Sequence, residues 1–206
     1  MKRLWLQIGP VLQGNVSLGE FNLLWAFQAQ DPASLHSLPM INALWQGFAP
    51  QGLHLLGLST GMEAFDAEAE TRSQDWLAAI AEDPVWVLPQ IPIALDDLHR
   101  AEAPIPESHI SFLCESIPAF ASWPLHEQEA LRLKARRYLA SKPDWAVTLT
   151  LSELSYLPAL VLFNRYYEVL EEWSIPADAE EIWARIAYWL SHVERPEPRD
   201  PFVDPF

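Results

Sequence analysis

Cysteine is nearly absent from this chain of 206 residues, which holds only Cys114. One thiol cannot form a disulfide within the chain, and its isolation also excludes a two-cysteine redox pair and a cysteine-rich zinc site. The six histidines are scattered without the spacing of metal ligands, so we expect no metal and no cofactor. Glycine is scarce too, with seven residues in all, which argues against a glycine-rich nucleotide loop.

Basic residues are also few, and long apolar runs are missing from the sequence. The chain has 13 Lys and Arg against 28 Asp and Glu, a formal net charge of -15. Nucleic acids and anionic membrane surfaces are bound mainly through Lys and Arg, so we expect neither as a partner. No stretch approaches the roughly 20 apolar residues of a membrane span. The apolar run within residues 1–10 is too short for a signal peptide, which makes the cytoplasm the default location and keeps the periplasm as an alternative.

Apolar residues are abundant and make up 50% of the chain, including 10 Trp, 9 Phe and 5 Tyr, enough for a sizeable core. The length fits one domain with an insertion better than two full domains. We therefore expect a domain over residues 1–193 with a helical insertion at about 104–144. Residues 194–206 hold four prolines and two Asp-Pro-Phe triplets, and we expect an extended tail there.

The hydrophobic pattern alternates between strand-like and helix-like segments, which predicts an α/β fold with a mixed central sheet. Prolines at 84, 89 and 92 limit residues 85–95 to a short or edge strand. The other expected strands are 3–8, 22–28, 53–58 and a hairpin of 157–163 with 168–173, and the expected helices are 35–48, 64–81, 108–120, 126–139 and 177–193.

Residues 21–27 (FNLLWAF) and residues 38–44 (LPMINAL) resemble two segments of the thioredoxin superfamily, in its TlpA/ResA-like, redoxin branch. The first resembles the strand that leads into the active site, and the second resembles the helix with its kinking proline. Residues 49–60 are similar to the next loop and strand, and residues 157–164 (LPALVLFN) to the hairpin that begins at a cis-proline. The resemblance covers residues 15–65 and 150–193, and it implies a thioredoxin-like three-layer α/β/α fold.

The residues at the expected active-site position lack the two cysteines of the family. Counting back from Pro39 places the two family cysteines at Asp31 and Ser34, in the tetrapeptide Asp31-Pro32-Ala33-Ser34. A carboxylate and a hydroxyl can replace neither the thiolate at the helix N-terminus nor the resolving thiol. Asp is a favoured N-cap and Pro a favoured first helical residue, so the tetrapeptide predicts a helix start. The alternative is a small polar site beside Pro158.

The resemblance further implies that the Leu157–Pro158 peptide bond is cis and that the backbone beside it pairs with an extended peptide. Together these features predict a thioredoxin-fold protein without redox activity that binds a partner polypeptide, as an adaptor, assembly factor or chaperone-like module. The alternative function is a thiol-disulfide oxidoreductase or peroxide-reducing enzyme of the redoxin family.

Three further features each have two interpretations. Cys114 lies in an apolar stretch and is either an inert buried thiol or the thiol of a one-cysteine peroxidase. His36, on the expected active-site helix, is either a solvated histidine or part of the site. Five of the 13 basic residues fall within residues 132–142. This run is either a solvated helix face or a docking surface for acidic groups, including those of a second copy in a homodimer.

Overall fold

The computed structural model describes residues 2–61 and 65–192, so the Asp-Pro-Phe tail lies outside the described residues. Within them, six strands form one mixed sheet in the order β1-β4-β3-β2-β7-β8. Strands β2, β3 and β4 are parallel, whereas β1, β7 and β8 each run antiparallel to their neighbour. The expected α/β fold with a mixed sheet is confirmed. The strands are β1 (Ile8–Gln13), β2 (Phe21–Phe27), β3 (Leu53–Ser59), β4 (Ile93–Asp96), β7 (Ala159–Asn164) and β8 (Val169–Ser174).

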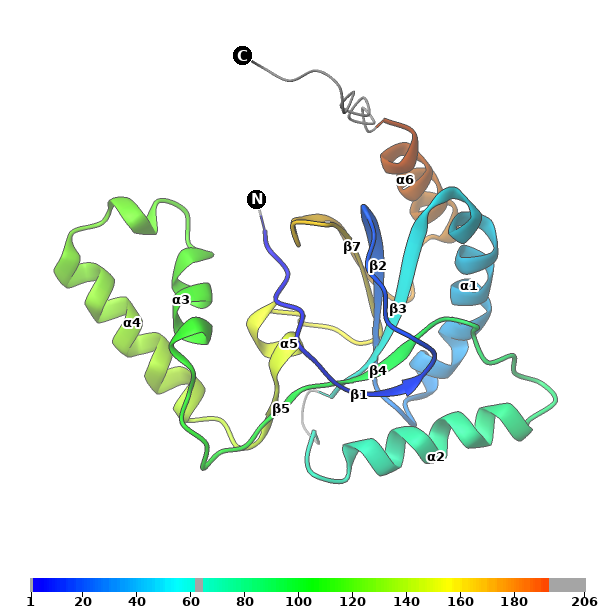
Figure 1. Ribbon diagram of the computed structural model, residues 1–206, viewed down its shortest axis with the longest axis horizontal. Coiled ribbons are helices and arrows are strands. Elements are labelled where there is room, and N and C mark those ends of the chain that lie inside the picture. Colours follow the sequence, from blue (N-terminus) through cyan, green and yellow to red (C-terminus); the bar gives the residue numbers. More distant parts are fainter. Residues whose placement is uncertain (1, 62–64, 193–206) are drawn as a thin grey trace, which may run out of the picture.

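Helices cover both faces of this sheet (Figure 1). Helices α1 (Pro32–Phe48) and α6 (Ala179–His192) pack side by side on one face, and the short helix α5 (Val147–Leu151) lies on the other. Helix α2 (Ala69–Glu82) runs below β4 in Figure 1. Every residue of β2 is buried, including the polar Asn22, so both faces of the strand are covered, as expected for a central strand of an α/β sheet.

The contact between α1 and α6 depends on a glycine. A Cβ atom placed on Gly47 of α1 would lie 2.3 Å from the Trp183 ring of α6. The Trp183 ring also packs against Phe48, with 4.6 Å between ring centroids. The missing side chain at position 47 therefore gives the indole its place between the two helices.

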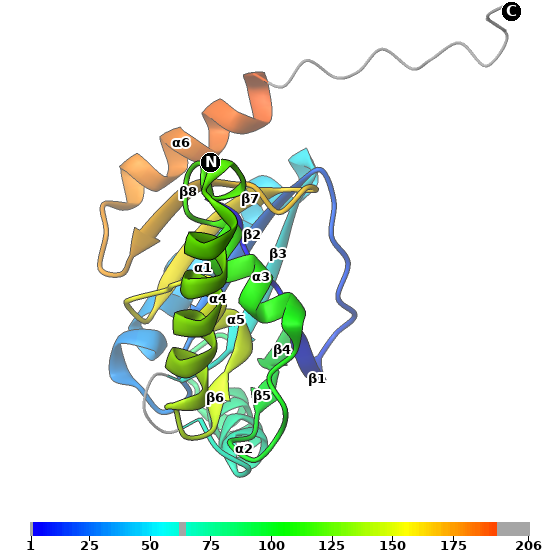
Figure 2. The same cartoon turned by 90° about the vertical axis from the view of Figure 1, so that its left-hand side faces the viewer.

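The segment that we expect to be a helical insertion, called the insertion below, forms helices beside the sheet that share a small core of their own. Helices α3 (Glu107–Glu115) and α4 (Leu125–Ala140) pack together, joined by the short 3₁₀ helix η2 (Phe120–Ser122). A two-stranded ribbon of β5 (Leu98–His99) and β6 (Trp145–Ala146) connects them to the sheet, as Figure 2 shows. A second 3₁₀ helix, η1 (Ala49–Gln51), follows α1.

One expected strand is misplaced, and another takes one of its two expected forms. The first strand spans Ile8–Gln13 rather than residues 3–8, and residue Arg3 forms only an isolated bridge to Glu168. The strand after the prolines is short, as expected, but it is not an edge strand, because β4 lies between β1 and β3. Pro10 instead occupies the edge strand β1, where a missing N–H group is tolerated. Helix α5 has no counterpart among the expected elements.

Candidate functional site

The register of the sheet brings three loops together at one of its ends. Ala26 of β2 pairs with Ala159 of β7, and Phe27 pairs with Ser59 of β3. The residues that follow β2 and β3 and the residue that precedes β7 therefore meet at the same end. Thr60 strengthens this arrangement by donating its backbone N–H to the Phe27 carbonyl at 2.8 Å. The start of α1, the end of β3 and Pro158 thus form one candidate site.

Asp31 and Ser34 are bonded to each other at the first turn of α1. The Asp31 carboxylate is the N-cap: its Oδ2 atom accepts a hydrogen bond from the Ser34 backbone N–H at 2.8 Å and another from the Ser34 hydroxyl at 2.9 Å. The Ser34 Oγ atom in turn accepts from the Gln28 N–H at 3.2 Å. Pro32 and Ala33 complete the helix start. Ser34 is fully buried, so its hydroxyl is committed to this local network.

The other two residues of interest at this end are also placed. The Leu157–Pro158 peptide bond is cis, Pro158 is buried, and its carbonyl accepts the Ile175 N–H at 2.9 Å. The exposed His36 lies one turn into α1, where Nδ1 is 2.6 Å from the Pro32 carbonyl oxygen. Its ring meets the Trp86 ring edge-on at 5.5 Å between centroids. His36 therefore faces the loop before β4 and does not line the pocket described next.

A pocket of about 440 Å³ opens beside the start of α1. The residues that form it come from the ends of β2 and β3 and from the beginning of α2, and they combine apolar and polar groups. Gln30 lines the pocket and has a left-handed backbone conformation, with a φ of 70°. Arg72 pairs with Asp66 at 3.0 Å, and this hydrogen-bonded contact lowers the pKa of Asp66. Lining residues include Ala29, Gln30, Asp31, Thr60, Phe65 and Arg72.

Beneath this pocket lies a fully buried acid that sequence reasoning does not single out. Asp96 ends β4 and accepts hydrogen bonds from the Thr148 and Leu149 N–H groups, at 2.8 and 3.1 Å. The Thr60 hydroxyl donates to it at 2.8 Å. Burial raises the pKa of Asp96 to about 6, although these hydrogen bonds act in the opposite direction. The carboxylate thereby links the pocket residue Thr60 to the first turn of α5.

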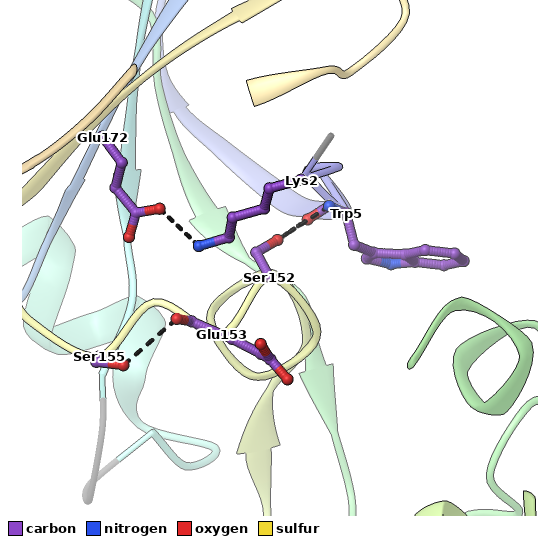
Figure 3. Close-up of polar contacts among 6 residues, drawn as sticks. All are labelled: Lys2, Trp5, Ser152, Glu153, Ser155 and Glu172. Carbon is purple, nitrogen blue, oxygen red and sulfur yellow. Dashed lines mark hydrogen bonds and ion pairs between the residues drawn. The ribbon is translucent and has the colours of Figure 1, made fainter. Parts of the chain in front are cut away.

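The loop between α5 and Pro158 is held by the N-terminal segment (Figure 3). Trp5 donates its N–H to the Ser152 hydroxyl at 2.9 Å, and this hydroxyl donates to the Trp5 carbonyl at 3.0 Å. Further along the loop, the Ser155 hydroxyl lies 3.4 Å from the Glu153 carbonyl. Lys2 pairs with Glu172 of β8 at 2.6 Å. The chain before β1 therefore spans from the edge strand to the loop that precedes Pro158.

Cys114 is not part of this end of the sheet. It belongs to α3 in the insertion, where it is 1% exposed and packs with Ile110, Phe120 and Leu139. Burial raises the pKa of the Cys114 thiol, which favours the unreactive protonated form. Across residues 2–61 and 65–192, no group of three or more His, Cys, Asp or Glu could hold a metal ion. The same residues contain no helix long and apolar enough to cross a membrane.

Comparison with known proteins gives matches in structure only. No protein-family model and no curated protein matches the chain. A thiol-disulfide isomerase from Corynebacterium glutamicum superposes with a TM-score of 0.58 at 13% identity, over 93% of this chain and 97% of that one. A thioredoxin-like superfamily protein, SPOA0173, gives a TM-score of 0.58 at 15% identity, over 94% and 98% of the two chains.

A third solved structure agrees with these two. The thioredoxin domain of a thiol-disulfide oxidoreductase from Bacteroides vulgatus superposes with a TM-score of 0.50 at 13% identity, over 91% of this chain and 95% of that one. The chain therefore has a thioredoxin-like fold, and it carries this fold with a single cysteine and no Cys-x-x-Cys pair.

Proposed function

We propose that this chain is a thioredoxin-fold binding protein that has lost thiol-disulfide chemistry and holds a segment of a partner polypeptide. The binding site is the pocket beside the start of α1, lined by residues such as Ala29, Thr60 and Phe65. An adaptor, assembly or chaperone-like role fits a site of this kind, because such proteins bind a partner polypeptide without making or breaking its covalent bonds.

The surroundings of Ser34 and Cys114 support the first half of the proposal, the loss of thiol-disulfide chemistry. Ser34 is fully buried, and its hydroxyl bonds to the Asp31 carboxylate. Activation of a hydroxyl needs a neighbouring base that is itself oriented by a third group, and the Asp31–Ser34 pair instead completes a helix cap. Cys114 lies in the insertion with a raised pKa, which counts against the alternative of a redoxin-type enzyme.

The lining of the pocket supports the second half of the proposal, the binding of a partner polypeptide. Its lining combines the apolar surfaces of Ala29 and Phe65 with the polar groups of Gln30 and Thr60, the mixture that small concave binding sites use. Tyr156, two residues before Pro158, is 68% exposed and offers an aromatic contact at the same end of the sheet. Exposed Tyr residues of this kind often anchor protein interfaces.

The test is selection of peptides from a phage-displayed random library on the immobilised protein, followed by fluorescence polarisation with the selected peptides. Ala29→Trp fills the pocket and should weaken peptide binding at least tenfold. Ala78→Trp places the same side chain on the exposed face of α2, away from the pocket, and should leave binding unchanged. Recovery of no binding peptide, or equal affinity of both variants, would contradict the proposed site.

A redox assay tests the lost chemistry separately. The wild type and Cys114→Ser should both reduce insulin no faster than buffer containing the same reductant. Catalysis that disappears in Cys114→Ser would show a working thiol and would support the enzyme alternative instead.

A further inference from the structure

A second pocket, of about 340 Å³, lies in the helical insertion and is separate from the end of the sheet described above. It opens between residues 101–105, the last turns of α4 and the β5–β6 ribbon. Helix α4 stands apart from α1 and α2 in Figure 1. Its volume is within the range of pockets that hold small molecules.

The charge of this pocket is opposite to that of the chain. Arg136 and Lys142 line it, and none of its lining residues is Asp or Glu, although the net charge of the chain is -15. Arg136 also pairs with Glu107 outside the lining at 2.6 Å. Lys142 lies 4.9 Å from the centre of the Tyr138 ring, and it forms no ion pair with any residue in the described part of the chain. Its ammonium group is therefore available to an anionic ligand.

Aromatic and aliphatic groups form the other wall. Trp145 is 5% exposed and its ring lies against the His99 ring, with 4.7 Å between centroids and 34° between planes. Leu139 and Ile105 complete this apolar surface. Such a wall suits the flat face of a ring, because aromatic groups pack well in offset or tilted arrangements.

His99 adds a polar group whose hydrogen bonding is incomplete. It is 8% exposed, it lines the pocket, and its Nε2 atom is buried with no hydrogen-bond partner among the described residues. Buried polar atoms of native proteins are nearly always paired, so this nitrogen of a lining residue, like Nδ1 of the neighbouring His109, lacks a polar neighbour. A ligand with oxygen atoms would bring polar groups to this wall.

From these observations we propose that the insertion binds a small aromatic carboxylate. The carboxylate lies against Lys142 and Arg136, which supply charge-assisted hydrogen bonds. The ring of the ligand packs on Trp145 and Leu139. The two cations select for negative charge, and the apolar wall selects against anions without a hydrophobic body.

The experiment is isothermal titration calorimetry of the full chain with sodium benzoate and sodium phenylacetate, each compared with its neutral amide and with inorganic phosphate. The aromatic carboxylates should bind saturably, and the amides and phosphate should bind at least tenfold more weakly. Equal binding of the amides, stronger binding of phosphate, or no saturable binding of either carboxylate would overturn the proposal.

Two variants locate the bound ligand. Lys142→Gln should weaken the binding of the aromatic carboxylates at least tenfold. Lys134→Gln removes a charge from α4 outside the pocket lining and should leave the binding unchanged. Ala103→Trp fills the pocket without changing charge and should also abolish binding. Far-UV circular dichroism confirms that each variant is folded. Equal affinities of the wild type, Lys142→Gln and Ala103→Trp would place the ligand elsewhere and contradict the assignment.

Discussion

The Asp31 carboxylate accepts two hydrogen bonds from Ser34, one from its backbone N–H and one from its hydroxyl, both through Oδ2. The first bond is the standard N-cap contact, and the second also satisfies a hydroxyl that is fully buried. The thioredoxin resemblance assigns two cysteines to these positions. Here the Asp31–Ser34 pair stabilises the start of α1 and provides no reactive group.

Replacement of the cap should destabilise the protein. Asp31→Ala removes the acceptor of both Ser34 donors, so we expect the free energy of unfolding to fall by about 1–2 kcal/mol. Asp31→Asn keeps a capping oxygen and should cost less. Urea denaturation followed by tryptophan fluorescence measures both. Equal stability of Asp31→Ala and the wild type would show that the contact contributes nothing.

Introduction of two thiols should create a disulfide. The side chains of Asp31 and Ser34 already meet, and the thioredoxin resemblance assigns these positions, the N-cap and the first turn of α1, to a redox pair. In a Cys114→Ser background, Asp31→Cys combined with Ser34→Cys should therefore oxidise to an internal disulfide, seen by mass spectrometry as the loss of two hydrogens. The single Ser34→Cys variant is the control. Thiols that stay free under oxidant would show that the two positions are not equivalent to such a pair.

Asp96 should give stability a distinctive pH dependence. Folding raises its pKa from 3.8 to about 6, so the folded state holds a proton that the unfolded state releases between these values. The contribution of Asp96 is thus greatest below pH 3.8 and falls as the pH rises towards 6, by about 3 kcal/mol in total. Asp96→Asn cannot titrate, so the stability of the wild type relative to this variant should decrease over the same range.

Chemical denaturation of both proteins at a series of pH values from 4 to 7 measures this difference, since other titrating groups contribute equally to each. A difference that is constant with pH would show that the pKa of Asp96 is the same in the folded and unfolded states.

The contact of Gly47 with Trp183 should make the effect of one substitution depend on another. In the wild type, Gly47→Ala displaces the Trp183 ring from between α1 and α6 and should cost roughly 1 kcal/mol or more. In a Trp183→Ala background the clash is absent, and Gly47→Ala should stabilise the helix by up to about 1 kcal/mol. A thermodynamic double-mutant cycle measures the coupling. The same effect in both backgrounds would mean that the indole does not require the glycine.

Local sequence patterns predict much of this fold and less of its sites. The continuous apolar run of β2, the capped start of α1 and the four-residue turn of the β7–β8 hairpin are all properties of neighbouring residues, and each lies close to its expected position. The first strand is misplaced because the weak alternation of residues 3–8 resembles a strand, whereas Gly9 and Pro10 obscure the real one. The central place of β4 depends on which strands pair, and no local pattern encodes that.

The residues that line the two pockets are likewise not predicted by local sequence patterns. Thr60 and Arg72 come from different elements, and only the fold brings them to one cavity. Asp96 leaves a faint signal, an acid directly after the apolar residues 93–95, but its role appears only once α5 is seen to start above it. Lys142 and His99 are likewise 43 positions apart in the chain. Helix caps and strands are therefore predictable from neighbouring residues, whereas sites assembled from distant segments are not.

Residues 2–4 cover part of an edge of the sheet. Leu4 donates its N–H to the Tyr167 carbonyl and Val169 donates to the Lys2 carbonyl, so residues 2–4 occupy backbone groups at the start of the edge strand β8. An uncovered edge strand offers free N–H and C=O groups to any passing β-strand and can begin aggregation. By occupying the start of this edge and adding the Lys2–Glu172 ion pair, residues 2–4 leave fewer backbone groups of β8 open to intermolecular strand pairing.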